Sequence, residues 1–140
     1  MNPQRTALFD PWTDAQEIAE RLRRHQARLV IVLGAESWCA KCRALRPAFD
    51  ERANRAEPQD VWLWLDVQEH DEFIGDFVPD DLPLLLIYRT AQLVHTDVAS
   101  VTALDRVLQK QEEPVIAHRA PADLISRLLS ENWVPKPESE

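Results

Sequence analysis

Blocks of apolar and polar residues follow one another along this chain, and the period of the pattern changes from block to block. Leu29 to Leu33 is an unbroken aliphatic run, which predicts a strand buried on both faces of a sheet. Val61 to Val67 and Leu82 to Tyr88 are apolar runs that predict two further strands. A hairpin would join the latter to a fourth strand at Leu93 to Val98.

Helical periodicity lies between and after these strands. Leu45, Phe49 and Ala53 recur every four residues, which predicts a helix from about Cys39 to Ala56. The remaining predicted elements are helices at Asp14–Gln26, Gln68–Phe77, Val101–Gln111 and Pro121–Asn132, and a short strand at Pro114–His118. Strands that alternate with helices predict an α/β fold with a mixed central β-sheet flanked by helices. We expect one domain at 13–132, an N-terminal segment at 1–12 and a tail at 133–140.

Composition and charge narrow the class of protein. The 140 residues are 45% hydrophobic and include five Trp, which is enough for one packed domain. A formal charge of -8 argues against a nucleic-acid partner, because binding phosphates needs a basic surface. The chain has no apolar run long enough to span a membrane and no signal-peptide core at its N-terminus. We therefore expect a cytoplasmic protein with no membrane partner.

The only two cysteines, Cys39 and Cys42, stand where the first strand runs into the predicted helix. Unpaired N–H groups at a helix N-terminus favour a thiolate over a thiol. In a reducing compartment, a close cysteine pair is more often catalytic, redox-sensing or metal-binding than structural. A structural zinc site needs about four ligands, and the four His are scattered. We therefore predict a redox pair with no metal and no cofactor, against the alternative of cysteines that only pack.

The residues around this pair resemble the thioredoxin family. The family pattern is a Trp-Cys-x-x-Cys motif with a basic residue after it, then a Pro and an acidic pair. It recurs here as Trp38, Cys39, Cys42, Arg43, Pro47, Asp50 and Glu51. Pro83, at the start of a buried strand, corresponds to the family's cis-proline. The resemblance covers approximately Asp14 to Leu108 and implies a thioredoxin-like fold with a short C-terminal extension or an inserted helix. Either Val101–Gln111 is the family's last helix, or it is inserted and Pro121–Asn132 closes the fold.

The resemblance implies thiol–disulfide exchange with protein substrates that carry disulfides or thiols. Cys39 would attack a substrate disulfide as the nucleophile, and Cys42 would resolve the mixed disulfide. Pro83 has no N–H to compete for the sulfurs, and the backbone of Leu82 could pair with a substrate strand. A reductase or glutathione is the candidate electron donor.

Two residues beside the pair affect its expected chemistry. Trp38 would shield one side of it, or serve only as a half-buried packing aromatic. Lys41 stands in the dipeptide between the cysteines, where thioredoxins carry Gly-Pro. Its positive charge would favour the Cys39 thiolate, whereas an exposed lysine screened by solvent would have little effect.

A buried ion pair of the family is missing. Counting six residues back from the first cysteine places Leu33 where the family keeps a buried Asp, and Trp64 stands where it keeps the partner Lys, two residues before Asp66. Losing both partners together is often neutral or stabilising, which suggests a retuned fold. Glu36 is the nearest acidic substitute by sequence, although a loop Glu is more often simply solvated.

The expected substrate groove also departs from the family. Asp81, preceded by Asp80, replaces a Gly before the Leu82-Pro83 pair, which favours partners with basic surfaces unless these acids are only turn residues. A second family Gly falls near Ala99 or Ala120.

Three functions remain open on these residues. The first is a disulfide oxidoreductase that contributes to cell redox homeostasis and serves few partners. The second is a partner-binding or assembly module with little or no redox turnover. The third is a sensor whose disulfide gates binding.

Overall fold

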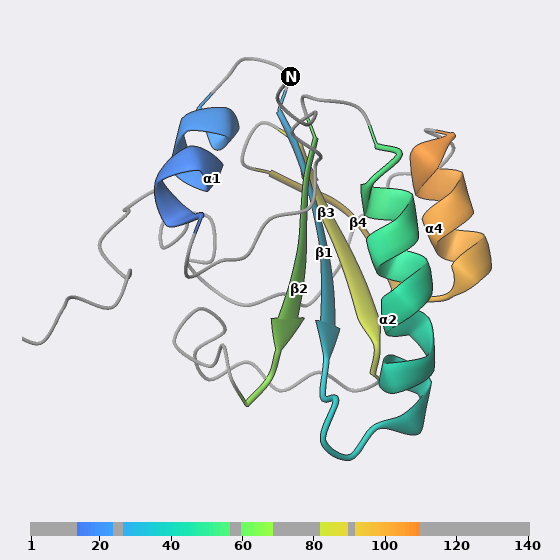
Figure 1. The fold of residues 1–140 in the computed structure, drawn as a ribbon. Helices are drawn as coiled ribbons and strands as arrows, with labels where there is room; N and C mark the ends of the chain where they lie inside the picture. Colours follow the sequence, from blue (N-terminus) through green and yellow to red (C-terminus); the bar gives the residue numbers. More distant parts are fainter. Residues whose placement is uncertain (1–13, 24–26, 57–59, 69–81, 90–91, 110–140) are drawn as a thin grey trace, which may run out of the picture.

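The computed structural model contains a four-stranded mixed sheet with helices on both faces (Figure 1). It describes residues 14–23, 27–56, 60–68, 82–89 and 92–109. The strands lie in the order β2-β1-β3-β4. Their bounds are β1 Arg28–Gly34, β2 Asp60–Asp66, β3 Leu84–Arg89 and β4 Gln92–Val98. β1 runs parallel to β2 and antiparallel to β3, and β4 completes a hairpin with β3. The four strands predicted from the sequence are confirmed.

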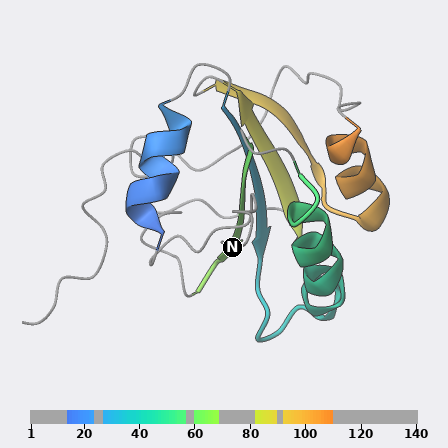
Figure 2. The same cartoon turned by 45° about the horizontal axis from the view of Figure 1, so that its top comes forward.

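Three helices in the described residues cover the sheet. Their bounds are α1 Ala15–Leu22, α2 Ala40–Ala53 and α4 Val101–Leu108. α1 lies on one face, whereas α2 and α4 lie side by side on the other, as the turned view in Figure 2 also shows. The predicted α/β architecture is therefore confirmed, with each helix shorter than expected. The predicted elements at 114–118 and 121–132, and all but the first residue of that at 68–77, lie outside the described residues.

β1 is buried along its whole length, as its unbroken aliphatic run predicts. Its side chains alternate between two clusters on the two faces of the sheet. Val30 and Val32 pack in the cluster under α2 and α4, whereas Leu29, Ile31 and Leu33 pack in the cluster under α1. A strand between two neighbours and two helical layers has no solvent-facing side, which explains why it carries no polar side chain after Arg28.

The cluster under α2 is built on aromatic rings. Phe49 of α2 packs against Trp62 and Trp64 of β2, with 5.5 Å between ring centroids in each pair. The predicted stripe is confirmed, because Leu45, Phe49 and Ala53 are all buried against the sheet. These contacts fix α2, and with it the cysteine pair, over the carboxyl ends of β1 and β2.

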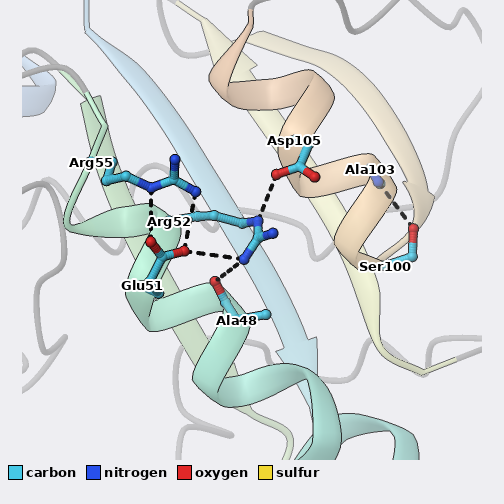
Figure 3. Close-up of polar contacts among 7 residues, drawn as sticks. All are labelled: Ala48, Glu51, Arg52, Arg55, Ser100, Ala103 and Asp105. Carbon is cyan, nitrogen blue, oxygen red and sulfur yellow. Dashed lines mark hydrogen bonds and ion pairs between the residues drawn. The ribbon is translucent and has the colours of Figure 1, made fainter.

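An arginine clamp joins α2 to α4 (Figure 3). Nε of Arg52 donates to Oδ1 of Asp105 at 2.7 Å, and a terminal nitrogen of the same side chain donates to the carbonyl of Ala48 at 3.3 Å. At the start of α4, the Ser100 hydroxyl accepts a hydrogen bond from the backbone N–H of Ala103 at 3.0 Å, as an N-cap does. The beginning of α4 is thus held at a fixed place beside α2.

A buried ion pair joins β1 and β2 at the edge opposite the cysteines. Nε of Arg28 donates to Oδ1 of Asp60 at 3.2 Å, and a terminal nitrogen donates to Oδ2 at 2.7 Å. Both side chains are 2% exposed and their residues are register partners. The bidentate geometry satisfies two charges that would otherwise be costly to bury.

Tyr88 makes the stability of the fold depend on pH in the alkaline range. Burial in the cluster under α1 raises the pKa of Tyr88 to about 12, above its ordinary value of 10.0. Between these values the folded protein keeps the phenol proton and the unfolded chain loses it. The free energy of unfolding is therefore unaffected by this group below pH 10, and falls by roughly 2 kcal/mol as the pH rises towards 12.

We expect Tyr88→Phe to lose less stability than the natural protein between pH 9 and pH 12. Urea unfolding at both pH values gives the comparison, and tyrosinate absorbance reports on this residue alone because the chain has one Tyr. Equal losses in the two proteins would show that the phenol is not protected from ionisation.

Candidate active site

The loop between β1 and α2 places both cysteines at one edge of the sheet. The backbone N–H of Cys39 donates to the carbonyl of Ala35 at 2.8 Å, which closes a turn just after the strand. Oδ2 of Asp66, at the end of β2, accepts the N–H of Glu36 at 2.9 Å, and its Oδ1 accepts the N–H of Gln68 at 2.8 Å. One buried carboxylate therefore ties the cysteine loop to the end of the neighbouring strand.

Cys39 is the N-cap of α2, as the sequence predicts for the helix start. Its Sγ accepts a hydrogen bond from the backbone N–H of Cys42 at 3.1 Å. The two residues form a disulfide with 5.2 Å between their Cα atoms. Cys42 is completely buried, whereas Cys39 is 9% exposed. Cys39 is therefore the more accessible of the two cysteines, and it lies at the positive end of a helix.

An apolar groove of about 310 Å³ lies beside the pair. It is lined by Lys41, Ala44, Leu45, Pro83, Val98, Ala99, Ser100 and Val101. Val98 and Val101 are 50% and 45% exposed, so the rim of the groove presents aliphatic side chains to solvent. The Leu82–Pro83 peptide bond is cis. Because Leu33 pairs with Leu84, Pro83 lies level with the end of β1, next to the cysteine loop.

The structure distributes the remaining predicted site residues around this groove. Trp38 is 62% exposed, so its ring is not a half-buried packing element. Lys41 is exposed and lines the groove, and Leu82 is partly buried against both clusters. The carboxylate of Glu36 is held 2.7 Å from a terminal nitrogen of Arg46, on the flank of α2.

Gly34 is the residue of β1 that faces the buried cysteine. A Cβ added there would lie 3.4 Å from Cβ of Cys42 and 2.7 Å from Cζ2 of Trp64. The indole of Trp64 therefore occupies the space that a side chain at position 34 would need.

Across the described residues, no three His, Cys, Asp or Glu side chains gather where they could hold a metal ion. None of the helices in that part of the chain is long and apolar enough to cross a membrane.

The comparisons with known proteins identify the family. The family model for thioredoxin matches residues 12–113, which is most of the chain. This chain belongs to the thioredoxin family. The resemblance drawn from the Trp-Cys-x-x-Cys motif is thereby confirmed, and so is the thioredoxin-like fold.

Solved thioredoxins share the fold with little sequence identity. Thioredoxin NaTrxh from Nicotiana alata is 15% identical with a TM-score of 0.60, and the match covers 81% of this chain and 99% of that one. Thioredoxin f from spinach chloroplast is 17% identical with a TM-score of 0.59, covering 79% and 98%. Schistosoma mansoni thioredoxin is 19% identical with a TM-score of 0.58, covering 74% and 94%. No curated protein matches the sequence.

The family match also bears on the C-terminal alternatives. It ends at residue 113, shortly after α4, and α4 packs beside α2 on the sheet. This favours Val101–Gln111 as the family's last helix and leaves the rest of the chain beyond it. The domain limits at 13 and 132 remain predictions.

Leu33 and Trp64, the two residues expected at the positions of the family's buried ion pair, lie on opposite faces of the sheet. Leu33 packs in the cluster under α1, on the opposite face of the sheet from Cys42. The residue of β1 whose Cβ position lies against Cys42 is Gly34, so a side chain at Leu33 does not reach the sulfur from this strand. Trp64 does lie on the face of Cys42, as expected. Side chains alternate along a strand, so counting residues along the sequence does not show which face of the sheet Leu33 occupies.

Asp66 is the functional residue whose role the sequence did not reveal. The sequence marks only its place two residues after Trp64, whereas the structure shows that its carboxylate positions the loop that carries the cysteines. A lone acid at the end of the apolar run Val61–Leu65 was the available signal.

Gly34→Ala is expected to destabilise the protein by about 1–3 kcal/mol. The added methyl group would lie 2.7 Å from a ring atom of Trp64, and that ring is held between the sheet and α2. Urea unfolding gives the measurement, with Ala99→Gly as a control at a buried position outside the ring contact. Unchanged stability of Gly34→Ala would mean that the indole moves aside freely.

Proposed function

We propose that this protein is a thiol–disulfide oxidoreductase that acts on protein partners, with Cys39 as the nucleophile and Cys42 as the resolving cysteine. The observation that carries the proposal is the placement of Cys39 as the N-cap of α2, where its Sγ accepts the Cys42 N–H. Helix N-terminal N–H groups stabilise a thiolate, and the thiolate is the attacking species. The greater exposure of Cys39 supports the same division of roles.

In the reducing direction the exchange has two steps. The Cys39 thiolate attacks a substrate disulfide, forms a bond to one substrate sulfur and releases the other as a thiolate. Cys42 then attacks Sγ of Cys39, which forms the internal disulfide and releases the second substrate sulfur. Two electrons pass to the substrate, and a reductase or glutathione would return the pair to the dithiol form.

The groove beside the pair is the proposed site of contact with the substrate protein. Its rim residues Val98 and Val101 offer an apolar surface, and Trp38 adds an exposed aromatic ring next to the nucleophile. An extended segment laid across the groove would pass the backbone of Leu82 and the side chain of Lys41. Asp80 and Asp81, which suggested basic partners, lie outside the described residues.

Trapping of a mixed disulfide tests this proposal. Reduced Cys42→Ser protein is mixed with a substrate protein that carries a disulfide. It is expected to form a covalent adduct through Cys39, and dithiothreitol should cleave this adduct by reducing the mixed disulfide. The matched control is the Cys39→Ser, Cys42→Ser double variant, which keeps the groove and lacks the nucleophile. An absent adduct, or an equal yield from the double variant, would refute the proposed role of Cys39.

A partner-binding module is the second candidate function. The residue facing Cys42 from β1 is a glycine, so this strand supplies no carboxylate to take the thiol proton. The double variant distinguishes the candidates, because a module keeps its partner without either sulfur. A redox sensor instead predicts partner affinity that differs between the oxidised and reduced forms. The cytoplasmic location expected from the sequence remains a prediction.

A further inference from the structure

A buried indole N–H of the cysteine cluster has no hydrogen-bond partner. Trp64 is 3% exposed, and among the described residues no acceptor lies within reach of its Nε1. A buried donor without a partner costs about 1–3 kcal/mol, so native structures rarely keep one without a reason. The disulfide form of the protein therefore carries a donor that is free to act in another state.

The indole ring that carries this N–H meets Cys42 over Gly34. Cε2, the ring atom bonded to Nε1, lies 3.2 Å from the place of a Gly34 Cβ, and Cζ2 lies 2.7 Å from it. Cβ of Cys42 lies 3.4 Å from the same point. The Cε2–Cζ2 bond of the indole, which adjoins Nε1, therefore lies beside Cys42 across a residue without a side chain. A side chain at position 34 would lie between the indole and Cys42, so this approach requires glycine.

The ring is held in this position by its neighbours. Phe49 packs edge-on against it with centroids 5.5 Å apart, and the guanidinium of Arg46 lies 5.1 Å from the ring centroid. Arg46 is paired with the carboxylates of Glu36 and Asp50, so its side chain is itself fixed. These contacts hold the indole ring in its place beside Cys42.

We propose that Nε1–H of Trp64 donates a hydrogen bond to the Cys42 thiolate when the pair is reduced. A disulfide sulfur is a weak acceptor, whereas a thiolate is charged and accepts strongly. Breaking the S–S bond separates the two sulfurs and supplies the acceptor that the indole lacks. The inference rests on the redox role proposed above and names the group that replaces the family's buried ion pair.

In this arrangement the Cys42 thiol is activated by a hydrogen-bond donor, the Trp64 N–H, which stabilises the thiolate, and not by a base that removes the proton. The hydrogen bond favours the Cys42 thiolate, which attacks Sγ of Cys39 and forms the internal disulfide. The bond between Cys39 and the substrate sulfur breaks in the same step. Trp64 keeps its proton throughout, and the proton lost from the Cys42 thiol passes to water and ends on the departing substrate thiolate.

Several charged groups lie on the elements next to Cys42 and would influence the same thiol. Asp66 follows on β2 with both carboxylate oxygens bound to backbone N–H groups, and Glu36 lies in the loop before the pair. Lys41 and Arg46 extend from α2, the latter neutralised by its carboxylate partners. All of them remain when Trp64 is replaced by Phe, which removes the N–H and keeps an aromatic ring beside Arg46.

The test is the ionisation of Cys42 in a Cys39→Ser background, where it is the only thiol. Thiolate absorbance against pH is compared for this protein and for the same protein with Trp64→Phe. We expect Trp64→Phe to raise the pKa of Cys42 by about one unit, a tenfold loss in the ionisation constant. The matched control is Trp62→Phe, because Trp62 is equally buried in the same cluster, packs on Phe49 at the same 5.5 Å, and also has an unpartnered Nε1.

Trp62→Phe should shift the Cys42 ionisation constant less than twofold, since Trp62 lies two residues further from the cysteine edge along β2. Equal shifts in the two variants, or no shift in either, would overturn the proposal. If Trp64→Phe does not fold, the indole N–H resonance of Trp64 in the natural protein gives the answer. It is expected to move downfield on reduction and to follow the Cys42 titration, and an unchanged resonance would overturn the proposal.

The titration needs no substrate, so it separates the two proposals. An unshifted ionisation with normal disulfide exchange would remove the role of Trp64 and leave the proposed function standing. The expected shift in a protein that exchanges no disulfide would support the hydrogen bond from Trp64 and refute the proposed function.

Discussion

Cys39→Ser is expected to lower the rate of disulfide exchange with a model disulfide by at least about two orders of magnitude. The substitution removes the more accessible of the two cysteines, which is also the one that caps the N-terminus of α2. Cys42→Ser should retain most of the rate of the first, bond-forming step, because Cys39 and its helix remain. It should fail to turn over, since nothing resolves the adduct. Single-turnover kinetics with a chromogenic disulfide separate the two steps.

The comparison is internal, because each variant differs from the natural protein by one sulfur atom. Far-ultraviolet circular dichroism establishes that both variants fold. If Cys42→Ser abolished the first step while Cys39→Ser preserved it, the assignment of nucleophile and resolving cysteine would be reversed.

Asp60→Ala is expected to lower the free energy of unfolding by about 3–5 kcal/mol. The carboxylate of Asp60 binds the Arg28 guanidinium through two contacts, of 2.7 and 3.2 Å, where both side chains are almost completely buried. Removing it leaves a guanidinium in the interior without its carboxylate. Urea unfolding followed by tryptophan fluorescence measures the loss, which is a large part of the stability of an ordinary domain.

The matched variant replaces both partners, as Arg28→Met with Asp60→Leu. Two apolar side chains of similar volume leave no buried charge, so the double variant should be clearly more stable than Asp60→Ala. A double variant as unstable as the single one would show that packing, and not the loss of the Asp60 carboxylate beside a buried guanidinium, causes the loss. The cysteine pair lies at the other edge of the sheet, so its exchange chemistry should survive in folded Asp60→Ala protein.

Much of this fold follows from local patterns in the sequence. The run Leu29 to Leu33 is aliphatic because β1 has a helical layer on each face, and that arrangement leaves a pattern that needs no structure to recognise. The stripe of Leu45 and Phe49 likewise gave the face that α2 buries. The start of α2 at the cysteines was also predictable, because the chain changes period there and the family motif fixes the position.

The site required knowledge of how distant segments meet. Leu33 was expected near Cys42 from its distance in sequence, whereas the structure places it on the opposite face and Gly34 against Cys42, which cannot be seen without the register. Ala99 and Val101 are more than fifty residues from the pair in sequence, yet they line the groove beside it. The role of Asp66 depends on hydrogen bonds to backbone groups, which carry no signature in the sequence.

The equilibrium of the Cys39–Cys42 pair with glutathione tests the proposed redox role most directly. The full chain is equilibrated in buffers of graded ratio between reduced and oxidised glutathione, quenched with an alkylating reagent, and weighed by mass spectrometry. The expected result is one two-electron transition between dithiol and disulfide, at a potential between about -270 and -120 mV. A pair that shows no transition between dithiol and disulfide anywhere in the series would contradict the redox role of this site.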